Sequence, residues 1–219
     1  MNTRVPQQQR GIQTKQQIIE AAMRLFSQKG FHGTNTKEIA RAAGVATGCF
    51  YAYFGDKKAV FMEALTLYFA QFHQIAQEQI ARLSTAGAGQ KPFFKEMIRS
   101  FLKAHGVFKD FHHELTAMYY TDPAVLQLVA AYDAACIGYI SRYLTGIQAQ
   151  LRVTDLEAAA KVVYWSIHSV VDAIAFTAAP NEAQLVDALA DMIESYLFAP
   201  SGTPAAQGVR PDDSLSPGG

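Results

Sequence analysis

The sequence predicts an all-α protein of about nine helices. Apolar residues recur at intervals of three and four along most of the chain, and no segment shows the two-residue alternation of a half-buried strand. Half of the 219 residues are hydrophobic and 17% are charged, which is typical of a globular protein rather than a disordered one. The length suits one large domain or two small ones.

Four helices are expected in the first part of the chain. Polar residues 1–10 are predicted to form a flexible arm ahead of them, and Gly30 is predicted to end the first helix. The hydroxyl of Thr36 is expected to cap the second helix. The four helices are predicted over residues 14–30, 36–43, 46–53 and 57–83.

Five more helical stretches follow a small-residue loop predicted at residues 84–90. A break is expected at Asp122-Pro123, because proline suits the first turn of a helix and disfavours helix in the residue before it. Residues 199–219 are rich in Pro and Gly and are predicted to be a disordered tail. The five stretches are predicted over residues 91–104, 107–121, 123–150, 154–178 and 181–198.

The charges divide the chain into a basic front and an acidic body. Residues 1–73 carry a net charge of +5 and residues 74–219 a net charge of −5, although the whole chain is neutral. Such a division predicts two modules with different partners. Two cysteines, no secretory signal and no uninterrupted apolar span lead us to expect a cytoplasmic protein without disulfides and without a membrane partner.

Residues 34–65 have the pattern of a helix-turn-helix, in which two short helices flank a glycine turn at Gly44 and the second helix enters the major groove of DNA. At 100° per residue, Thr47, Gly48 and Tyr51 share one face of the second helix, and Phe50 points inward. Thr47 is expected to read a base edge, Gly48 to allow close approach, and Tyr51 to bind a phosphate.

The ordered features of residues 11–66 resemble the DNA-binding domain of the TetR family of bacterial transcriptional regulators. They are Ala21-Ala22, Leu25-Phe26, Gly30-Phe31, Thr36, Ile39-Ala40, Ala43-Gly44-Val45, Gly48, Phe50-Tyr51, Tyr53-Phe54 and Asp56-Lys57. The resemblance covers about a quarter of the chain. It implies DNA contacts by Thr36, Lys37, Thr47, Gly48, Tyr51, Tyr53 and Lys57.

Several alternatives stay open in this segment. Tyr53 and Phe54 are also suited to the core of the domain, and Phe54 is expected there. Cys49 is expected to be a small filler rather than a redox sensor. Arg4 and Arg10 are expected in a solvated tail rather than in a minor groove. Many relatives have a polar residue at the position of Ala46, which puts more weight on base contacts by Thr47 and Lys37.

The resemblance implies that residues 67–198 form a ligand-binding and dimerisation domain. Helices near 154–178 and 181–198 are apolar over wide faces and are expected to pair across a two-fold axis. Candidate ligand-binding residues are His105, Tyr119, Tyr120, Tyr139, Trp165, His168 and Asp172. His168 and Asp172 are four residues apart and can pair either inside a pocket or at the surface or dimer interface.

Two other sets of residues are predicted not to form a site. The sequence His112-His113-Glu114 is expected to be a solvated cluster rather than a metal site, because neighbouring helical residues point about 100° apart. Five phenylalanines are expected in the core rather than in a pocket: Phe93, Phe94, Phe101, Phe108 and Phe111.

The sequence thus predicts a homodimeric transcriptional regulator, a repressor that a small-molecule ligand releases from a palindromic operator. No catalytic motif, metal site or cofactor site is predicted, so an enzyme is disfavoured. The alternative is an architectural or protein-controlled DNA-binding protein without a small-molecule effector.

Overall fold

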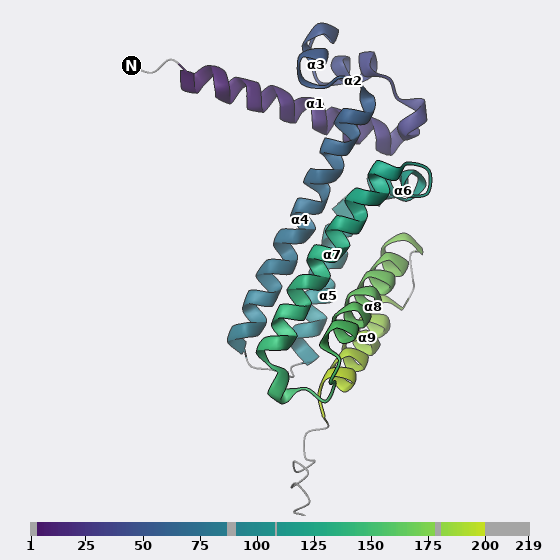
Figure 1. Ribbon diagram of the computed structural model, residues 1–219. Helices are drawn as coiled ribbons and strands as arrows, with labels where there is room; N and C mark the ends of the chain where they lie inside the picture. The colour runs from purple at the N-terminus through teal and green to yellow at the C-terminus, as the bar shows by residue number, and fades with distance from the viewer. Residues whose placement is uncertain (1–3, 87–90, 108, 178–180, 200–219) are drawn as a thin grey trace, which may run out of the picture.

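The computed structural model describes residues 4–86, 91–107, 109–177 and 181–199, and nearly all of them are helical (Figure 1). The predicted all-α class is confirmed. The helices are α1 (Arg4–Gly33), α2 (Thr36–Ala42), α3 (Thr47–Tyr53), α4 (Lys57–Ala86), α5 (Lys91–Val107), α6 (Lys109–Tyr119), α7 (Pro123–Gly146), α8 (Leu156–Thr177) and α9 (Glu182–Leu197), with a short 3-10 helix at Gln148–Gln150.

Two segments predicted to be non-helical are helical. The predicted flexible arm is helical from Arg4 onward, because glutamine is a good helix former and Pro6 falls in the first turn, where its missing N–H costs nothing. Residues 84–86, predicted as loop, continue α4. Residues 87–90 of that loop and residues 200–219 of the predicted tail lie outside the described residues.

Glycines end two helical segments of the N-terminal domain where the sequence predicted. Gly30 has φ 75° and ψ 165° and breaks the helical path of α1, so that Phe31 turns back into the core. Gly44 has φ 71°, a conformation that side chains disfavour, and separates α2 from α3. The cap of α2 differs from the prediction: Asn35, not Thr36, accepts the N–H of Glu38.

Helices α1 to α3 and the start of α4 form a small domain at one end of the molecule, and α4 runs from it into the helical body (Figure 1). The core of this domain is continuous with the core of the body. It continues into the body through Phe111, Leu115 and Met118 of α6 and Val125 of α7. A second core holds α5, α7, α8 and α9 together.

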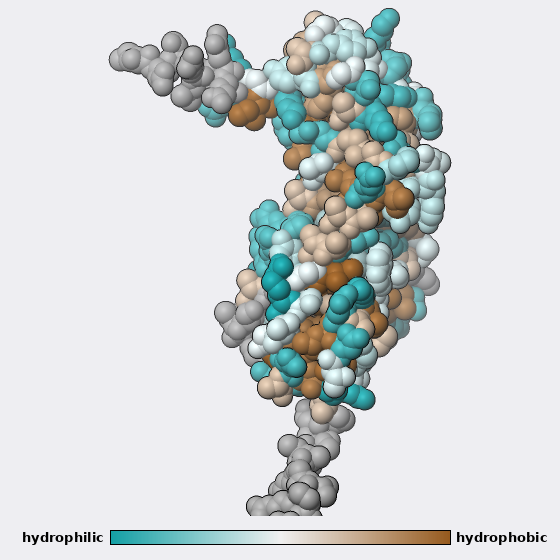
Figure 2. Space-filling view, viewed as in Figure 1, coloured by the Kyte–Doolittle hydropathy of each residue, from teal (hydrophilic) through white to brown (hydrophobic). Residues whose placement is uncertain are grey.

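The body has exposed hydrophobic surface along its length, below the small domain (Figure 2). By length and composition α7 is apolar enough to cross a membrane, with a mean hydropathy of 1.4 in its most apolar part, whereas the sequence was expected to contain no such segment. It packs against α4 and α8 in the bundle, and one such helix is weak evidence for a membrane.

Candidate nucleic-acid interface and ligand cavity

One outward face of the small domain is formed by α3 and the start of α2. Phe50 is fully buried behind α3, which leaves Thr47, Gly48 and Tyr51 toward solvent. The hydroxyls of Tyr51 and Thr36 lie 3.0 Å apart, and the Tyr51 side chain is 53% exposed. This hydrogen bond joins the two helices on the face where the sequence placed the DNA contacts.

Gly48 and Lys37 are open to solvent on this face. Apart from its chain neighbours and the backbone of its own helix, no atom of the described residues lies within 4 Å of the position where a side chain would begin at Gly48, so the backbone there is open to approach. Lys37 is exposed in the first turn of α2. The face therefore offers a basic group, hydroxyls and bare backbone, which suit phosphates and base edges.

Lys57 has a role that the sequence did not predict. Its ammonium donates to the carbonyl oxygens of Phe31 at 2.7 Å and Thr34 at 3.0 Å and lies 4.5 Å from the centre of the Phe31 ring. These contacts tie α4 to the end of α1. Because the ammonium has carbonyl partners in this chain, the predicted phosphate contact would require it to leave them.

The other candidates of this segment differ in exposure. The Tyr53 side chain is half-buried against the core, with its hydroxyl beside Gly11 of α1. Phe54 is buried, as predicted. Cys49 is a free thiol of intermediate exposure. Arg10 is exposed on α1, and the side chain of Arg4 lies outside the described part of the chain.

A cavity with two adjoining compartments lies in the body among α4 to α9. The wider compartment, of about 270 Å³, has polar and aromatic walls. The narrower one, of about 90 Å³, is almost wholly apolar and includes Phe94, Met97 and Ile140. Four side chains border both compartments: Phe72, His105, Tyr132 and His168.

Six of the seven ligand candidates line the wider compartment, and their role in binding stays a prediction. They are His105, Tyr119, Tyr120, Trp165, His168 and Asp172. The seventh, Tyr139, lies elsewhere: its hydroxyl is 2.5 Å from His73 Nε2 and 2.8 Å from Gln77 Nε2, in the contact of α7 with α4. The side chain is half-buried there, and these two partners satisfy its hydroxyl.

Four of the five phenylalanines predicted in the core have described side chains. Phe94 is buried in the core as predicted and also lines the narrow compartment, and Phe101, partly buried against the core, lines it too. Phe111 is buried in the core that the small domain shares with the body, and Phe93 packs at the edge of the second core. The side chain of Phe108 lies outside the described residues.

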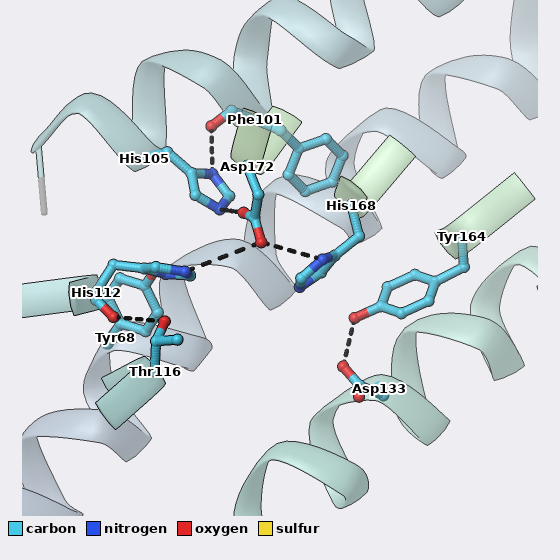
Figure 3. Close-up of polar contacts among 9 residues, drawn as sticks. All are labelled: Tyr68, Phe101, His105, His112, Thr116, Asp133, Tyr164, His168 and Asp172. Carbon is cyan, nitrogen blue, oxygen red and sulfur yellow. Dashed lines mark hydrogen bonds and ion pairs between the residues drawn. The ribbon is translucent and has the colours of Figure 1, made fainter. Parts of the chain in front are cut away.

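Asp172 is the centre of the polar wall and has three histidines around it (Figure 3). His105 Nε2 lies 3.2 Å from Oδ1 of Asp172, and His168 Nδ1 lies 3.3 Å from Oδ2. His112 Nε2 is 3.9 Å from the same Oδ2. His168 and Asp172 therefore pair in the cavity wall.

The prediction of a solvated cluster at residues 112–114 is wrong. The His112 side chain is only 12% exposed, and its Nδ1 lies 2.8 Å from the hydroxyl of Tyr68. Glu114 accepts the backbone N–H of Phe31 at 2.7 Å, and His113 packs on Phe176. Among the described residues, no group of His, Cys, Asp and Glu is arranged to hold a metal ion.

Burial and neighbouring charges set the protonation states of Asp172 and His112 in this wall. Burial raises the pKa of Asp172, but the three histidines outweigh burial and hold that pKa below its usual value, so the carboxylate is charged at neutral pH. Burial lowers the pKa of His112 to about 4, although Asp172 opposes this shift. His112 is thus neutral at pH 7.

Two buried oxygens in the cavity wall have no hydrogen-bond partner among the described residues. They are Oδ1 of Asp172, which His105 approaches without hydrogen-bond geometry, and the hydroxyl of Tyr143. Leaving such a group unpaired costs about 1–3 kcal/mol. A molecule bound in the cavity with matching polar groups would remove this cost. By contrast, the nearby carboxylate of Asp133 is paired with the hydroxyl of Tyr164 at 2.5 Å (Figure 3).

We expect the protein to lose stability in acid through His112. A histidine with a lowered pKa in the folded state binds a proton more readily when unfolded, so the free energy of unfolding falls as the pH drops from 6.5 towards 4. The loss is at most about 3 kcal/mol. The free energy of unfolding is measured by urea unfolding at several pH values between 7 and 4. His112→Gln should show a smaller fall in this free energy in acid, whereas His32→Gln, at an exposed site, should show the same fall as wild type. An equal fall in the free energy of unfolding in wild type and His112→Gln would contradict this role of His112.

Family models match both the N-terminal and the C-terminal part of the chain. The model for "Bacterial regulatory proteins, tetR family" matches residues 18–64, and the model for "Tetracyclin repressor-like, C-terminal domain" matches residues 92–197. Together they cover more than half of the chain. The chain belongs to the TetR family. TetR-family proteins are DNA-binding transcriptional regulators and not enzymes.

Individual TetR-family relatives are similar over different lengths. AcrR of Shigella flexneri is 47% identical over 55 residues, which are 25% of this chain and 26% of that protein. HbdR of Aromatoleum sp. (strain CIB) is 40% identical over 70 residues, 32% of this chain and 31% of that protein. The chain thus spans about a quarter to a third of these curated relatives.

A solved structure extends the likeness to the fold of the whole chain. GusR of Salmonella enterica superposes with a TM-score of 0.67 and 21% identity over 84% of this chain and 95% of that one. This likeness shows the TetR fold beyond the helix-turn-helix. The residues of the cavity therefore have to be interpreted from their own geometry.

Proposed function

We propose that this TetR-family regulator is a cytoplasmic homodimeric repressor that binds a palindromic operator and leaves it when a small molecule occupies the cavity. The observation that carries the DNA-binding part is the α2–α3 face, where Phe50 is buried and Thr47, Gly48 and Tyr51 face outward. Thr36 and Lys37 extend this face at the start of α2. In this arrangement α3 enters the major groove and α2 holds the phosphate backbone.

The proposed dimer forms through α8 and α9. On these helices Val162, Trp165 and Met192 are almost half exposed, while Val163, Ile167 and Leu189 pack inward. A second copy is the proposed cover for the outward apolar residues, because a two-fold axis would bring the same surface of both copies together. The pair would present two recognition helices about 34 Å apart, one turn of DNA. Sedimentation at micromolar concentration tests this: one species of monomer mass, 24.0 kDa, would contradict it.

The proposed link between cavity and DNA is α6. His112, Leu115 and Thr116 of this helix line the wider compartment. On the same helix, Glu114 accepts the N–H of Phe31 and lies against Gly30, where the path of α1 breaks. A ligand that shifts α6 would therefore move the end of α1. The ligand acts by binding one arrangement of the two domains more tightly than the other.

We expect Glu114→Ala to weaken the coupling between ligand and DNA. The variant keeps the residues of the cavity and of the α2–α3 face but loses the hydrogen bond that joins α6 to Phe31. Coupling free energies are about 1–3 kcal/mol, so the ligand-induced loss of DNA affinity should shrink about tenfold. Fluorescence anisotropy of labelled operator, with and without ligand, measures it. Unchanged coupling in Glu114→Ala would exclude this route.

We expect Tyr51→Phe to weaken DNA binding in general and Thr47→Ala to weaken operator binding alone. Tyr51→Phe removes a hydroxyl proposed to bind a phosphate and should weaken binding to operator and random DNA alike, by about threefold to tenfold. Thr47→Ala removes a base contact and should weaken operator binding alone, by a similar factor. Titrations of both DNAs at one salt concentration measure the difference. Equal losses on both DNAs for both variants would defeat the assignment.

A further inference from the structure

The lining of the cavity contains acidic side chains but no lysine or arginine among the described residues. Among the described residues that line the two compartments, none is lysine or arginine, and two, Asp133 and Asp172, are carboxylates. Asp133 is already paired with Tyr164, whereas Oδ1 of Asp172 is buried without a hydrogen bond. The site therefore holds a negative charge and an unfilled acceptor.

His105 lies next to this acceptor but does not satisfy it. Its Nδ1 lies 2.9 Å from the carbonyl oxygen of Phe101, so Nδ1 is the nitrogen that carries the proton. Its Nε2 lies 3.2 Å from Oδ1 of Asp172, yet this oxygen has no hydrogen-bond partner among the described residues. A bound N–H donor would supply the hydrogen bond that Oδ1 lacks.

Aromatic rings and the narrow compartment complete the site. Tyr119, Tyr120 and Trp165 line the same compartment as Asp172, and aromatic faces attract cations. The narrow compartment shares four bordering side chains with the wider one and has almost no polar wall. An apolar group attached to the cation would fit there.

We propose that the ligand of this cavity is a small amphiphile with a protonated amine or amidine head, which donates N–H hydrogen bonds to Asp172, and an apolar tail that enters the narrow compartment. Its role as effector rests on the proposed function. Its binding does not, because Trp165 is the only tryptophan of the chain and lines the wider compartment, so its fluorescence reports occupancy without DNA when the protein concentration, and with it the proposed dimer, is held constant.

The test compares three probes with the same eight-carbon tail: octylamine, octanol and octanoate at pH 7.5. Octylamine should saturate the Trp165 signal with an affinity at least about tenfold above that of octanol, because a charge-assisted hydrogen bond is stronger than a neutral one. Octanoate should bind most weakly. Octanoate binding as tightly as octylamine, or no saturable change with octylamine, would overturn the proposal.

Two variants locate the charge that selects the probe. Asp172→Asn should weaken octylamine about tenfold or more and leave octanol within about twofold. Glu182→Gln, which removes the same charge at an exposed site on α9, should change neither. Urea unfolding of Asp172→Asn checks that the variant is folded. Unchanged octylamine affinity in folded Asp172→Asn would contradict the proposal.

Operator binding separates this proposal from the proposed function. A saturable change in Trp165 fluorescence with octylamine, without any change in operator binding, would support the ligand class and contradict the effector role. Octanoate that binds and releases the operator would support the effector role and contradict the ligand class.

Discussion

Gly48→Glu is expected to abolish operator binding while the protein stays folded. Outside its chain neighbours and its own helix backbone, no atom of the described part of the chain lies within 4 Å of the new side chain's first carbon, and glutamate is a better helix former than glycine, so α3 should tolerate the change. On the proposed face, however, the carboxylate would point at the base edges and phosphates of the DNA. Like charges in contact cost several kcal/mol, so affinity should fall about a hundredfold or more.

The control is the same substitution at Gly146, the last residue of α7, which also has open space around it. Gly146→Glu adds the same charge far from α3 in the chain and should bind operator about as well as wild type. Anisotropy titrations at fixed salt compare the three proteins. Full operator binding by Gly48→Glu would remove α3 from the interface.

Phe61→Ala is expected to cause the largest loss of stability among single substitutions in the shared core. Phe61 is fully buried, and its ring lies 5.3 Å from Phe26, 5.2 Å from Phe31 and 5.6 Å from Phe111. It thus joins α1, α4 and α6, and truncation leaves a cavity at their junction. The expected loss in the free energy of unfolding is about 3–5 kcal/mol.

Urea unfolding followed by circular dichroism measures this loss. Tyr120→Ala removes an aromatic ring that is 81% exposed, and it should change the free energy of unfolding by less than about 0.5 kcal/mol. A loss in Phe61→Ala no larger than that in Tyr120→Ala would mean that the domain and the body do not depend on this aromatic junction.

Local patterns predicted most of the fold. The positions of Gly44 and Pro123, and the burial of Phe50, follow from turn chemistry, helix starts and a 3.6-residue period, all of which act within a few residues. The cap at Asn35 was missed although its signal was present, since Glu38 stands three residues later as in a capping box.

The polar wall of the cavity could not be predicted because it depends on contacts between distant helices. His112 and Asp172 come from α6 and α8, and no spacing in the sequence links them. The same holds for Asp133 and Tyr164, and for the ammonium of Lys57 on the end of α1. His168 and Asp172 were found in advance because they are one helical turn apart.

Selection of genomic DNA fragments by the purified protein at moderate salt, followed by sequencing, tests the central claim most directly. Sequence-specific binding by a dimer predicts enrichment of one inverted repeat whose half-sites are about one DNA turn apart, and loss of that enrichment in Gly48→Glu. Uniform recovery of fragments that disappears at higher salt would mean contact with phosphates alone and would contradict the proposed regulator.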